Sequence, residues 1–505
     1  MQSLLRTARS TLPKMDTTQT TSSLIPFLSQ CRALLFGTST NHPKPPAATT
    51  FVLGNPSADL DSFISAVVFS FAYSRNHQRQ CAPLVNLFAV PSSDLWRLRP
   101  EFGTALWFAT QAKDPSSINQ DKDEVQDEEK QILQSNMITI HDLQHNEDTK
   151  TLFPTTGLPE SSNAKPLSVV LVDHNAPAIP NISSEYLSTL NLVGCIDHHE
   201  DESKVPCSAS PRIIKTGIGS CTTLVVQHLR DANLWPFPDT NSDSTTNQSA
   251  ATQLSILALA PIIIDTANLT APGKVSELDR ETVSFLERII HQCPSHKTFD
   301  RSKFYEAVSR SKETSLDNLT IEEILDRDYK EWTETSSSSS SSSSSKSVKI
   351  GISSSLKPIS YLLQKSNENS NPDPNSPTSL IPLIKSFSHS KSLDIHILMT
   401  AYTSPDSKFH REILLLPLTS QNSKFVSEFI HLHSEELGLQ PWHFEQTTTT
   451  NAFKERFQPF SSLSSSSSSS EPKAHDNVVY VFNQTALEKS RKQVGPMIRD
   501  TVRKG

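Results

Sequence analysis

The sequence predicts an α/β protein of two domains, in which a mainly parallel sheet forms the first domain. Three observations support this prediction. Short, mostly apolar runs, which are typical of buried parallel strands, alternate with longer segments of helical periodicity. Acidic and histidine residues follow several of these runs directly. A second series of β-rich runs begins near residue 348, after an unbroken serine run from Ser336 to Ser345.

Length and composition limit the classes of function. The 505 residues allow two or three domains, and the 35% hydrophobic content is low because polar runs interrupt the chain. The net charge of −8 argues against a general nucleic-acid or membrane-surface binder. We expect no membrane span, since no apolar run reaches ~18 residues. None of the six cysteines lies in a CxxC pair, so we expect reduced thiols in an intracellular protein.

The chain divides into four predicted parts. Residues 1–48 are expected to be a disordered tail that ends in a proline-rich segment, residues 49–330 to form the first domain, residues 331–347 to be a serine-rich linker and residues 348–505 to form the second domain with a serine-rich insert. The first fifteen residues are basic and lack acids, which is typical of a weak mitochondrial presequence. We therefore expect the cytoplasm, with the mitochondrial matrix as the alternative.

The elements of the first domain follow from apolar patterning. Strands are expected at 50–53, 167–172 and 191–196, and a helix at 62–74. The apolar segment 254–264 is long enough for a helix, although a strand fits as well. Polar and charged stretches at 113–131, 144–166 and 236–250 are expected to be inserts. The second domain is expected to contain β-rich runs at 348–352, 393–400, 412–418 and 478–482.

Two aspartates lie where the first predicted strand passes into the first predicted helix. Asp59 and Asp61 belong to the segment GNPSADLDS at 54–62. Ligand sites in open α/β sheets lie beyond the carboxyl ends of strands. Two carboxylates aimed at one point repel each other unless a cation lies between them. Capping of the helix by Asp61 or Ser62 explains the segment equally well.

Further polar clusters end the next predicted strands. Asp173 follows 167–172, and the run Asp197-His198-His199 ends 191–196. Imidazoles beside a carboxylate are typical of metal and phosphate chemistry, although a lone histidine pair is more often a solvated loop feature. Because acidic and histidine clusters recur at the ends of several predicted strands, we favour a metal or phosphate site.

Two weaker signals come from helix ends. Asp265 follows the apolar run 254–264, where a simple helix stop is an equal explanation. The segment GIGSCTT at 217–223, which contains Ser220, opens a helix, so its backbone N–H groups could hold an anion. A plain helix start explains this segment equally well.

The motifs GNPSADLDS, VDHN, DHH, GSCTT and DT, in this order and spacing, resemble the DHH phosphoesterase family, and SRKQ at 490–493 resembles its DHHA2 domain. The combination is most similar to the fungal exopolyphosphatase branch, with family II inorganic pyrophosphatases and prune-type proteins as relatives. The resemblance spans most of residues 50–500 and implies a DHH domain, a smaller DHHA2 domain and an active site in the cleft between them.

The resemblance also implies roles for individual residues. The implied metal ligands are Asp59, Asp61, Asp173, His198 and Asp265, with Asp173 in the bridging place. The implied catalytic or phosphate-binding residues are His199, Lys330, Arg491 and Lys492, and Ser220 is a further candidate. Asn55 stands where family II pyrophosphatases have a histidine, which favours the exopolyphosphatase branch.

We therefore expect an exopolyphosphatase that removes terminal phosphate from inorganic polyphosphate. Two divalent cations, Mg²⁺ or Mn²⁺ with Co²⁺ as a further candidate, would activate water. Further basic candidates for a polyanion cleft are Lys357, Lys385, Arg411 and Lys454. The alternatives are a pyrophosphatase or prune-like nucleotide phosphodiesterase and a non-catalytic interaction protein on the same scaffold. A monomer is expected, with no nucleic-acid or membrane partner.

Overall fold

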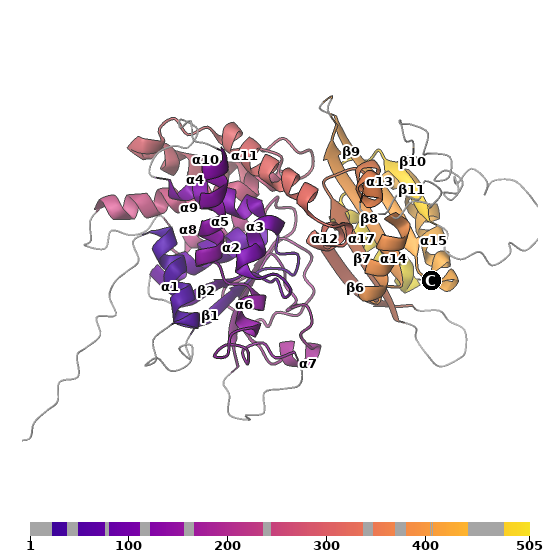
Figure 1. Ribbon diagram of the computed structural model, residues 1–505, viewed down its shortest axis with the longest axis horizontal. Helices are drawn as coiled ribbons and strands as arrows, with labels where there is room; N and C mark the ends of the chain where they lie inside the picture. The colour runs from indigo at the N-terminus through magenta and orange to yellow at the C-terminus, as the bar shows by residue number, and fades with distance from the viewer. Residues whose placement is uncertain are drawn as a thin grey trace, which may run out of the picture.

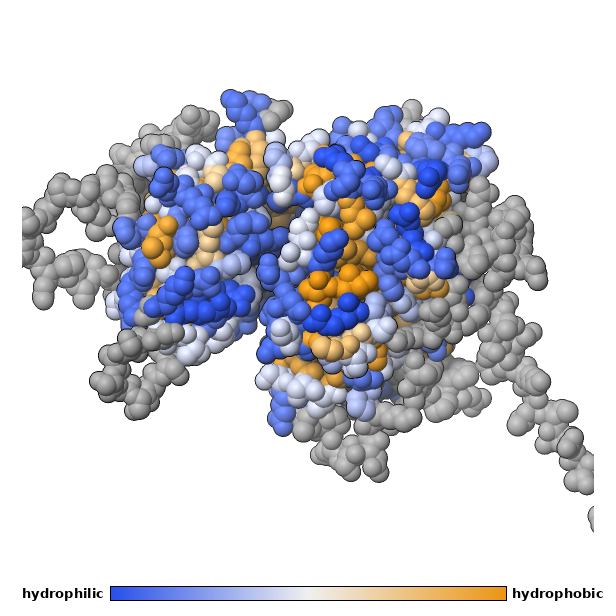
Figure 2. Space-filling model, turned by 180° about the vertical axis from the view of Figure 1, so that it is seen from behind, coloured by the Kyte–Doolittle hydropathy of each residue, from blue (hydrophilic) through white to orange (hydrophobic). Residues whose placement is uncertain are grey.

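The computed structural model describes residues 23–37, 49–75, 80–111, 122–155, 166–235, 244–336, 347–368, 380–404, 406, 408–442 and 479–504. These residues form two lobes, each with its own sheet (Figure 1). Seen from behind, a furrow separates the lobes, and most of the surface beside it is hydrophilic (Figure 2). Among the described helices, none combines the length and apolar composition needed to cross a membrane.

The first lobe is built from five short strands and many helices. Its strands are β1 (Thr50–Leu53), β2 (Cys81–Leu84), β3 (Ser168–Val172), β4 (Asn191–Asp197) and β5 (Arg212–Ile214). Its helices are α1 (Leu24–Phe36), α2 (Leu60–Arg75), η1 (Ser92–Asp94), α3 (Leu95–Leu98), α4 (Pro100–Thr110), α5 (Lys122–Asn136), α6 (Ile140–Gln144), α7 (Ser184–Leu187), α8 (Cys221–Asp231), α9 (Ser244–Asp265), α10 (Glu277–Gln292), η3 (Pro294–His296), α11 (Arg301–Thr314) and η4 (Ser315–Asn318).

The sheet of this lobe is parallel throughout and has the order β2-β1-β3-β4-β5. After β1 the chain crosses to β2 on one side and later returns to β3 on the other. The topological switch point therefore lies between β1 and β3, where ligand sites of open α/β sheets form. The predicted parallel sheet is confirmed, and the apolar segment 254–264 lies within helix α9.

One region of the predicted tail is ordered. Helix α1 buries Leu24, Phe27 and Leu28, and the ring of Phe27 packs edge-to-face on Phe71 with centroids 5.2 Å apart. The prediction of a disordered tail over all of residues 1–48 is therefore wrong. Apolar residues at 24, 27, 28, 31 and 35 carry the helical period, but the polar segments on both sides of this short stretch conceal it.

The second lobe surrounds a six-stranded mixed sheet of order β10-β11-β9-β8-β7-β6. Its strands are β6 (Tyr329–Thr335), β7 (Ser347–Ser355), β8 (Ile395–Thr403), β9 (Phe409–Pro417), β10 (Leu439–Pro441) and β11 (Tyr480–Gln484). Its helices are α12 (Ile321–Arg327), α13 (Ile359–Glu368), α14 (Leu380–Ser390), α15 (Ser420–Leu437) and α17 (Arg491–Lys504). Separate apolar clusters cover the two faces, one beneath α12 to α14 and one beneath α15 and α17.

The second sheet begins earlier than the sequence predicted. Residues 331–335, which were expected to belong to the linker, form most of the edge strand β6, which pairs antiparallel with β7. The strand was missed because it is largely polar and half-exposed, so it has no apolar run. Residues 337–345 of the serine run and the second serine run at 464–470 lie outside the described residues.

Candidate active site

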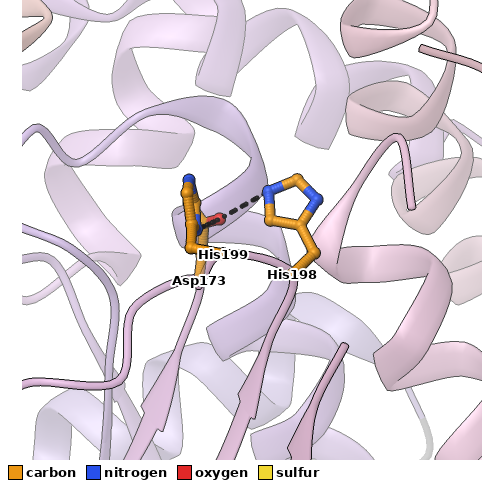
Figure 3. Close-up of side chains that lie close together, drawn as sticks. All are labelled: Asp173, His198 and His199. Atoms are coloured by element: carbon orange, nitrogen blue, oxygen red, sulfur yellow. Dashed lines mark ion pairs between the residues drawn. The ribbon is translucent and has the colours of Figure 1, made fainter. Parts of the chain in front are cut away.

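The site is formed where β1, β3 and β4 end. Asp173 follows β3, and Asp197, His198 and His199 close β4 at the same edge of the sheet. One ligand atom from each of Asp173, His198 and His199 lies within 4.8 Å of the others. Figure 3 shows the His198 ring pointing toward the Asp173 carboxylate. Parallel strands thus bring together side chains that are far apart in sequence.

Asp173 is the central carboxylate. Its backbone φ of +62° is unusual for a residue other than glycine. Such strained backbone conformations are common at functional positions. Asn55 Nδ2 and Ser62 Oγ each donate to its Oδ2 at 2.8 Å. Its other oxygen, Oδ1, is buried and has no hydrogen-bond partner among the described residues. Burial, Asp59 and Asp61 raise the pKa of Asp173 well above its usual range.

His198 is held as a neutral acceptor. Its Nδ1 donates to the carbonyl of Ile218 at 3.0 Å, so the lone pair of Nε2 faces the site. Burial and Lys492 lower the pKa of His198. Nε2 lies 3.2 Å from Asp173 Oδ1, which places two acceptors side by side. Lys492 Nζ donates to Nε2 at 3.2 Å, and a metal cation in place of that contact would bind both atoms.

Asp197 orients the second histidine. His199 Nδ1 donates to Asp197 Oδ1 at 2.8 Å, which leaves Nε2 as an acceptor. Asn175 Nδ2 donates to Asp197 Oδ2 at 2.5 Å, and Asn175 Oδ1 accepts from the Glu202 amide at 2.7 Å. Sequence reasoning assigned no role to Asn175, although it belongs to the VDHN motif at 172–175. This buried chain of hydrogen bonds fixes the ring of His199.

Asp61 and Ser220 connect two helix starts. Asp61 accepts hydrogen bonds from Ser220 Oγ at 2.8 Å, from the Cys221 amide at 2.6 Å and from the Thr222 amide at 2.9 Å. Its Oδ2 also lies 3.9 Å from His198 Nε2. The carboxylate therefore occupies the start of α8, where we expected an anion. The Ser220 side chain caps α8 and faces Asp61.

Asp59 and Asp265 complete the acidic cluster. Burial alone would raise the pKa of Asp59, but Lys330 and the Ser62 amide hold it below its usual range. Burial and the nearby Asp61 raise the pKa of Asp265 to about 8. Asp59 also contributes to the raised pKa of Asp265, and a bound cation would relieve this repulsion.

Two lysines of the second lobe face the imidazoles. Lys330, from β6, places Nζ 3.4 Å from His199 Nε2. Lys492, from the first turn of α17, places Nζ 3.2 Å from His198 Nε2. Among the described residues, neither lysine forms an ion pair with a carboxylate. Each lobe therefore contributes one half of the site.

Arg491 is placed differently from Lys492. Its guanidinium donates to the carbonyl and to Oδ1 of Asp328, both at 2.7 Å. Asp328 directly precedes β6, so this pair joins α17 to the strand that carries Lys330. In this arrangement Arg491 is neutralised by Asp328.

The residues present fit a divalent cation. The donor set combines a buried carboxylate oxygen that has no partner among the described residues, an imidazole nitrogen that accepts only from the Lys492 ammonium, and further carboxylates that raise the pKa of Asp173. Oxygen-rich sets of this kind suit Mg²⁺ or Mn²⁺, and imidazole tolerates Mn²⁺ and softer ions. Fold and site together define a two-domain α/β protein with an acidic and imidazole centre that faces lysines of the second domain.

Comparison with known families agrees with this description. The DHH family, N-terminal domain, matches residues 49–260, and the DHHA2 domain matches residues 308–501. The chain therefore carries an N-terminal domain of the DHH family followed by a DHHA2 domain. The DHHA2 match begins before β6, which agrees with the early start of the second sheet.

Several curated proteins are similar to this chain. A protein of Schizosaccharomyces pombe, provisionally named an exopolyphosphatase, is 26% identical over 81% of this chain and 87% of its own length. The exopolyphosphatase PRUNE1 of Mus musculus is 23% identical over 77% of this chain and 66% of its own length. The human PRUNE1 is 23% identical over 82% of this chain and 72% of its own length.

Among the solved structures that match is one from Methanococcus jannaschii, provisionally named a family II inorganic pyrophosphatase, which is 16% identical with a TM-score of 0.46. The match covers 90% of this chain and 99% of the other.

Proposed function

We propose that this protein is an exopolyphosphatase that hydrolyses terminal phosphate from inorganic polyphosphate. The observation that carries the proposal is the arrangement around Asp173. Its Oδ1, which has no hydrogen-bond partner among the described residues, lies 3.2 Å from His198 Nε2. The ammonium groups of Lys330 and Lys492, from the other lobe, donate to the two imidazoles. Such a site offers cation ligands on one side and anion ligands on the other.

The metal half would be held by Asp173 and His198, with the carboxylates of Asp59, Asp61 and Asp265 around them. When bound, divalent cations there supply charge neutralisation at phosphoryl oxygens and lower the pKa of water. Asp61 also caps α8, so it would share its oxygens between that helix and the centre. His199 is oriented by Asp197 and presents Nε2 to the phosphate side.

The substrate half would be held by Lys330 and Lys492. Both ammonium groups donate to imidazole nitrogens here, and a phosphate oxygen is a stronger acceptor for either of them. Arg491 could bind phosphate only after it releases Asp328. If it stays paired with Asp328, its role is to hold α17 in place.

Asn55 favours polyphosphate over pyrophosphate within this family. The amide is buried, and it donates to Asp173 and accepts from the Ala58 amide at 3.1 Å. It therefore supports the carboxylate instead of adding an imidazole to the centre. The family resemblance implies a histidine at this position in family II pyrophosphatases.

Phosphate release from long polyphosphate, tripolyphosphate and pyrophosphate, each with Mg²⁺ or Mn²⁺, tests the proposal. We expect release from the first two substrates. Release from pyrophosphate alone would assign a pyrophosphatase, and activity on none of them would favour a scaffold without catalysis.

A further inference from the structure

A second group of basic side chains lies beside the site but makes none of its contacts to the imidazoles. Lys274 belongs to the loop between α9 and α10 of the first lobe, Lys312 to α11, and Arg411 to β9 of the second lobe. Together with Lys330 and Lys492 they bring five cations to the face between the lobes. We define Lys274 and Arg411 as the outer tier and Lys330 and Lys492 as the inner tier.

Loop contacts place the outer tier across the gap between the lobes. A Cβ added to Gly219 would lie 2.7 Å from the carbonyl oxygen of Lys274, so the lysine loop rests on the GIGS segment beside Asp61. A Cβ on the preceding Gly273 would lie 4.0 Å from Cβ of Glu488, in the second lobe. Glu488 stands just ahead of the SRKQ segment, so both tiers border the same opening.

Arg411 points to this opening from the other side. It is only 6% exposed, and its Nε donates to the carbonyl of Leu487 at 2.6 Å. The guanidinium also lies 5.1 Å from the centre of the Phe409 ring. Neither contact is with an acid, although the charge of Glu488, at the same opening, also acts on Arg411.

These cations differ from lysines elsewhere because no described carboxylate lies within ion-pairing distance of them, although Asp265 and Glu488 act on Lys274 and Arg411 from farther away. On the outer surface, Lys349 pairs with Glu331, Lys408 with Asp406 and Lys489 with Glu436. Within the described ranges, none of the five cations between the lobes forms an ion pair with a carboxylate. Burial, Arg411 and Lys492 lower the pKa of Lys274 to about 8. Like charges held close together are stabilised when a polyanion binds.

We propose that Lys274 and Arg411 bind phosphate groups beyond the reacting end of the chain, so that the protein favours long polyphosphate over short substrates. The inference rests on the proposed function, since the inner tier holds the reacting end. Pyrophosphate has two phosphate groups and these are used at the centre and the inner tier. A longer chain adds charge-assisted contacts to the outer tier.

The test compares substrates of different length in matched variants. Lys274→Gln removes one outer charge, and Arg411→Lys keeps the charge while losing the Nε that donates to the Leu487 carbonyl. Lys408→Gln is the control, because Lys408 is exposed and pairs with Asp406 in the same lobe. The measurement is kcat/KM for long polyphosphate and for tripolyphosphate at several salt concentrations.

We expect Lys274→Gln to lower kcat/KM for long polyphosphate by ~10-fold and for tripolyphosphate by less than ~2-fold, since one charge-assisted contact is lost. The salt dependence on the long chain should become shallower. Equal losses on both substrates, or no loss on the long chain, would overturn the inference.

Binding of fluorescently labelled long polyphosphate to the metal-free protein separates this inference from the proposed function. We expect Lys274→Gln to weaken this binding by ~10-fold relative to Lys408→Gln. If the wild type releases no phosphate but binding shows this difference, the catalytic proposal fails and the outer tier stands. If the wild type binds no polyphosphate, or both variants bind alike, the outer tier is refuted.

Discussion

The two halves of the site are built in opposite ways. On the first lobe, short polar side chains at strand ends are buried and fixed by several hydrogen bonds each, as Asp61 and Asp197 are. On the second lobe, long lysine side chains of an edge strand and a helix start reach across, each with one contact to an imidazole. The comparison teaches that the metal half of the site is preorganised, whereas the substrate half can rearrange around a ligand.

The largest effect is expected from breaking the preorganised half at its centre. Asp173→Ala should lower kcat by at least ~1,000-fold, since it removes the carboxylate that faces both imidazoles. Steady-state phosphate release with saturating Mn²⁺ measures the loss. Asp201→Ala is the matched control, because Asp201 is exposed and pairs with Arg212 at 2.7 Å on the loop after the histidines. Near-normal turnover of Asp173→Ala would refute the assignment.

Substitutions in the substrate half should weaken substrate binding without weakening metal binding. Lys492→Met is expected to lower kcat/KM by ~10- to 100-fold, because a charge-assisted phosphate contact is lost. Its affinity for Mn²⁺ should stay the same or increase, since the ammonium no longer donates to His198 Nε2. Titration calorimetry with Mn²⁺ separates these effects. Weaker metal binding in this variant would show that the halves are not separable.

The supports of the preorganised half should matter for folding as well. Asn175→Ala should lower the free energy of unfolding by ~1–3 kcal/mol, since it leaves Asp197 Oδ2 and the Glu202 amide without this partner. Urea denaturation measures the change. Asn191→Ala is the control, since that amide is on the exposed end of β4. A loss equal to that of the control would argue against Asn175 as a support.

A smaller and graded effect is expected from pH in the metal-free protein. The pKa of Asp265 rises from 3.8 to about 8 on folding, so the native state binds this proton more tightly than the unfolded state does. The free energy of unfolding should therefore fall as pH rises from about 4 to about 8. Asp265→Asn should make the fall shallower. An unchanged pH dependence in that variant would contradict the raised pKa.

Sequence patterns predicted much of the first lobe because its strands are buried on both faces. The predicted strand at 50–53 is β1, and the runs at 167–172 and 191–196 contain or overlap β3 and β4. The sequence did not predict strand β6, because an exposed edge strand needs no apolar run. The sequence did not predict helix α1, because its short stretch of apolar residues at helical spacing lies between polar segments.

For the site, sequence could name residue types but not partners. The strand-end rule anticipated that Asp173 and His198 would meet. It could not show that Asp61 binds the start of α8, or that Arg491 turns to Asp328, because both depend on contacts more than 150 residues apart. The supporting role of Asn175 required the fold, since an amide in a polar turn has no distinctive pattern.

The central claim is that the metal half of the site holds a divalent metal ion between Asp173 and His198, opposite Lys330 and Lys492. Anomalous diffraction at the manganese edge, from crystals grown with Mn²⁺, tests it most directly. We predict anomalous density in contact with Asp173 Oδ1 and His198 Nε2, with Lys492 moved away from the imidazole. Manganese bound elsewhere, with Lys492 still donating to His198, would contradict the account.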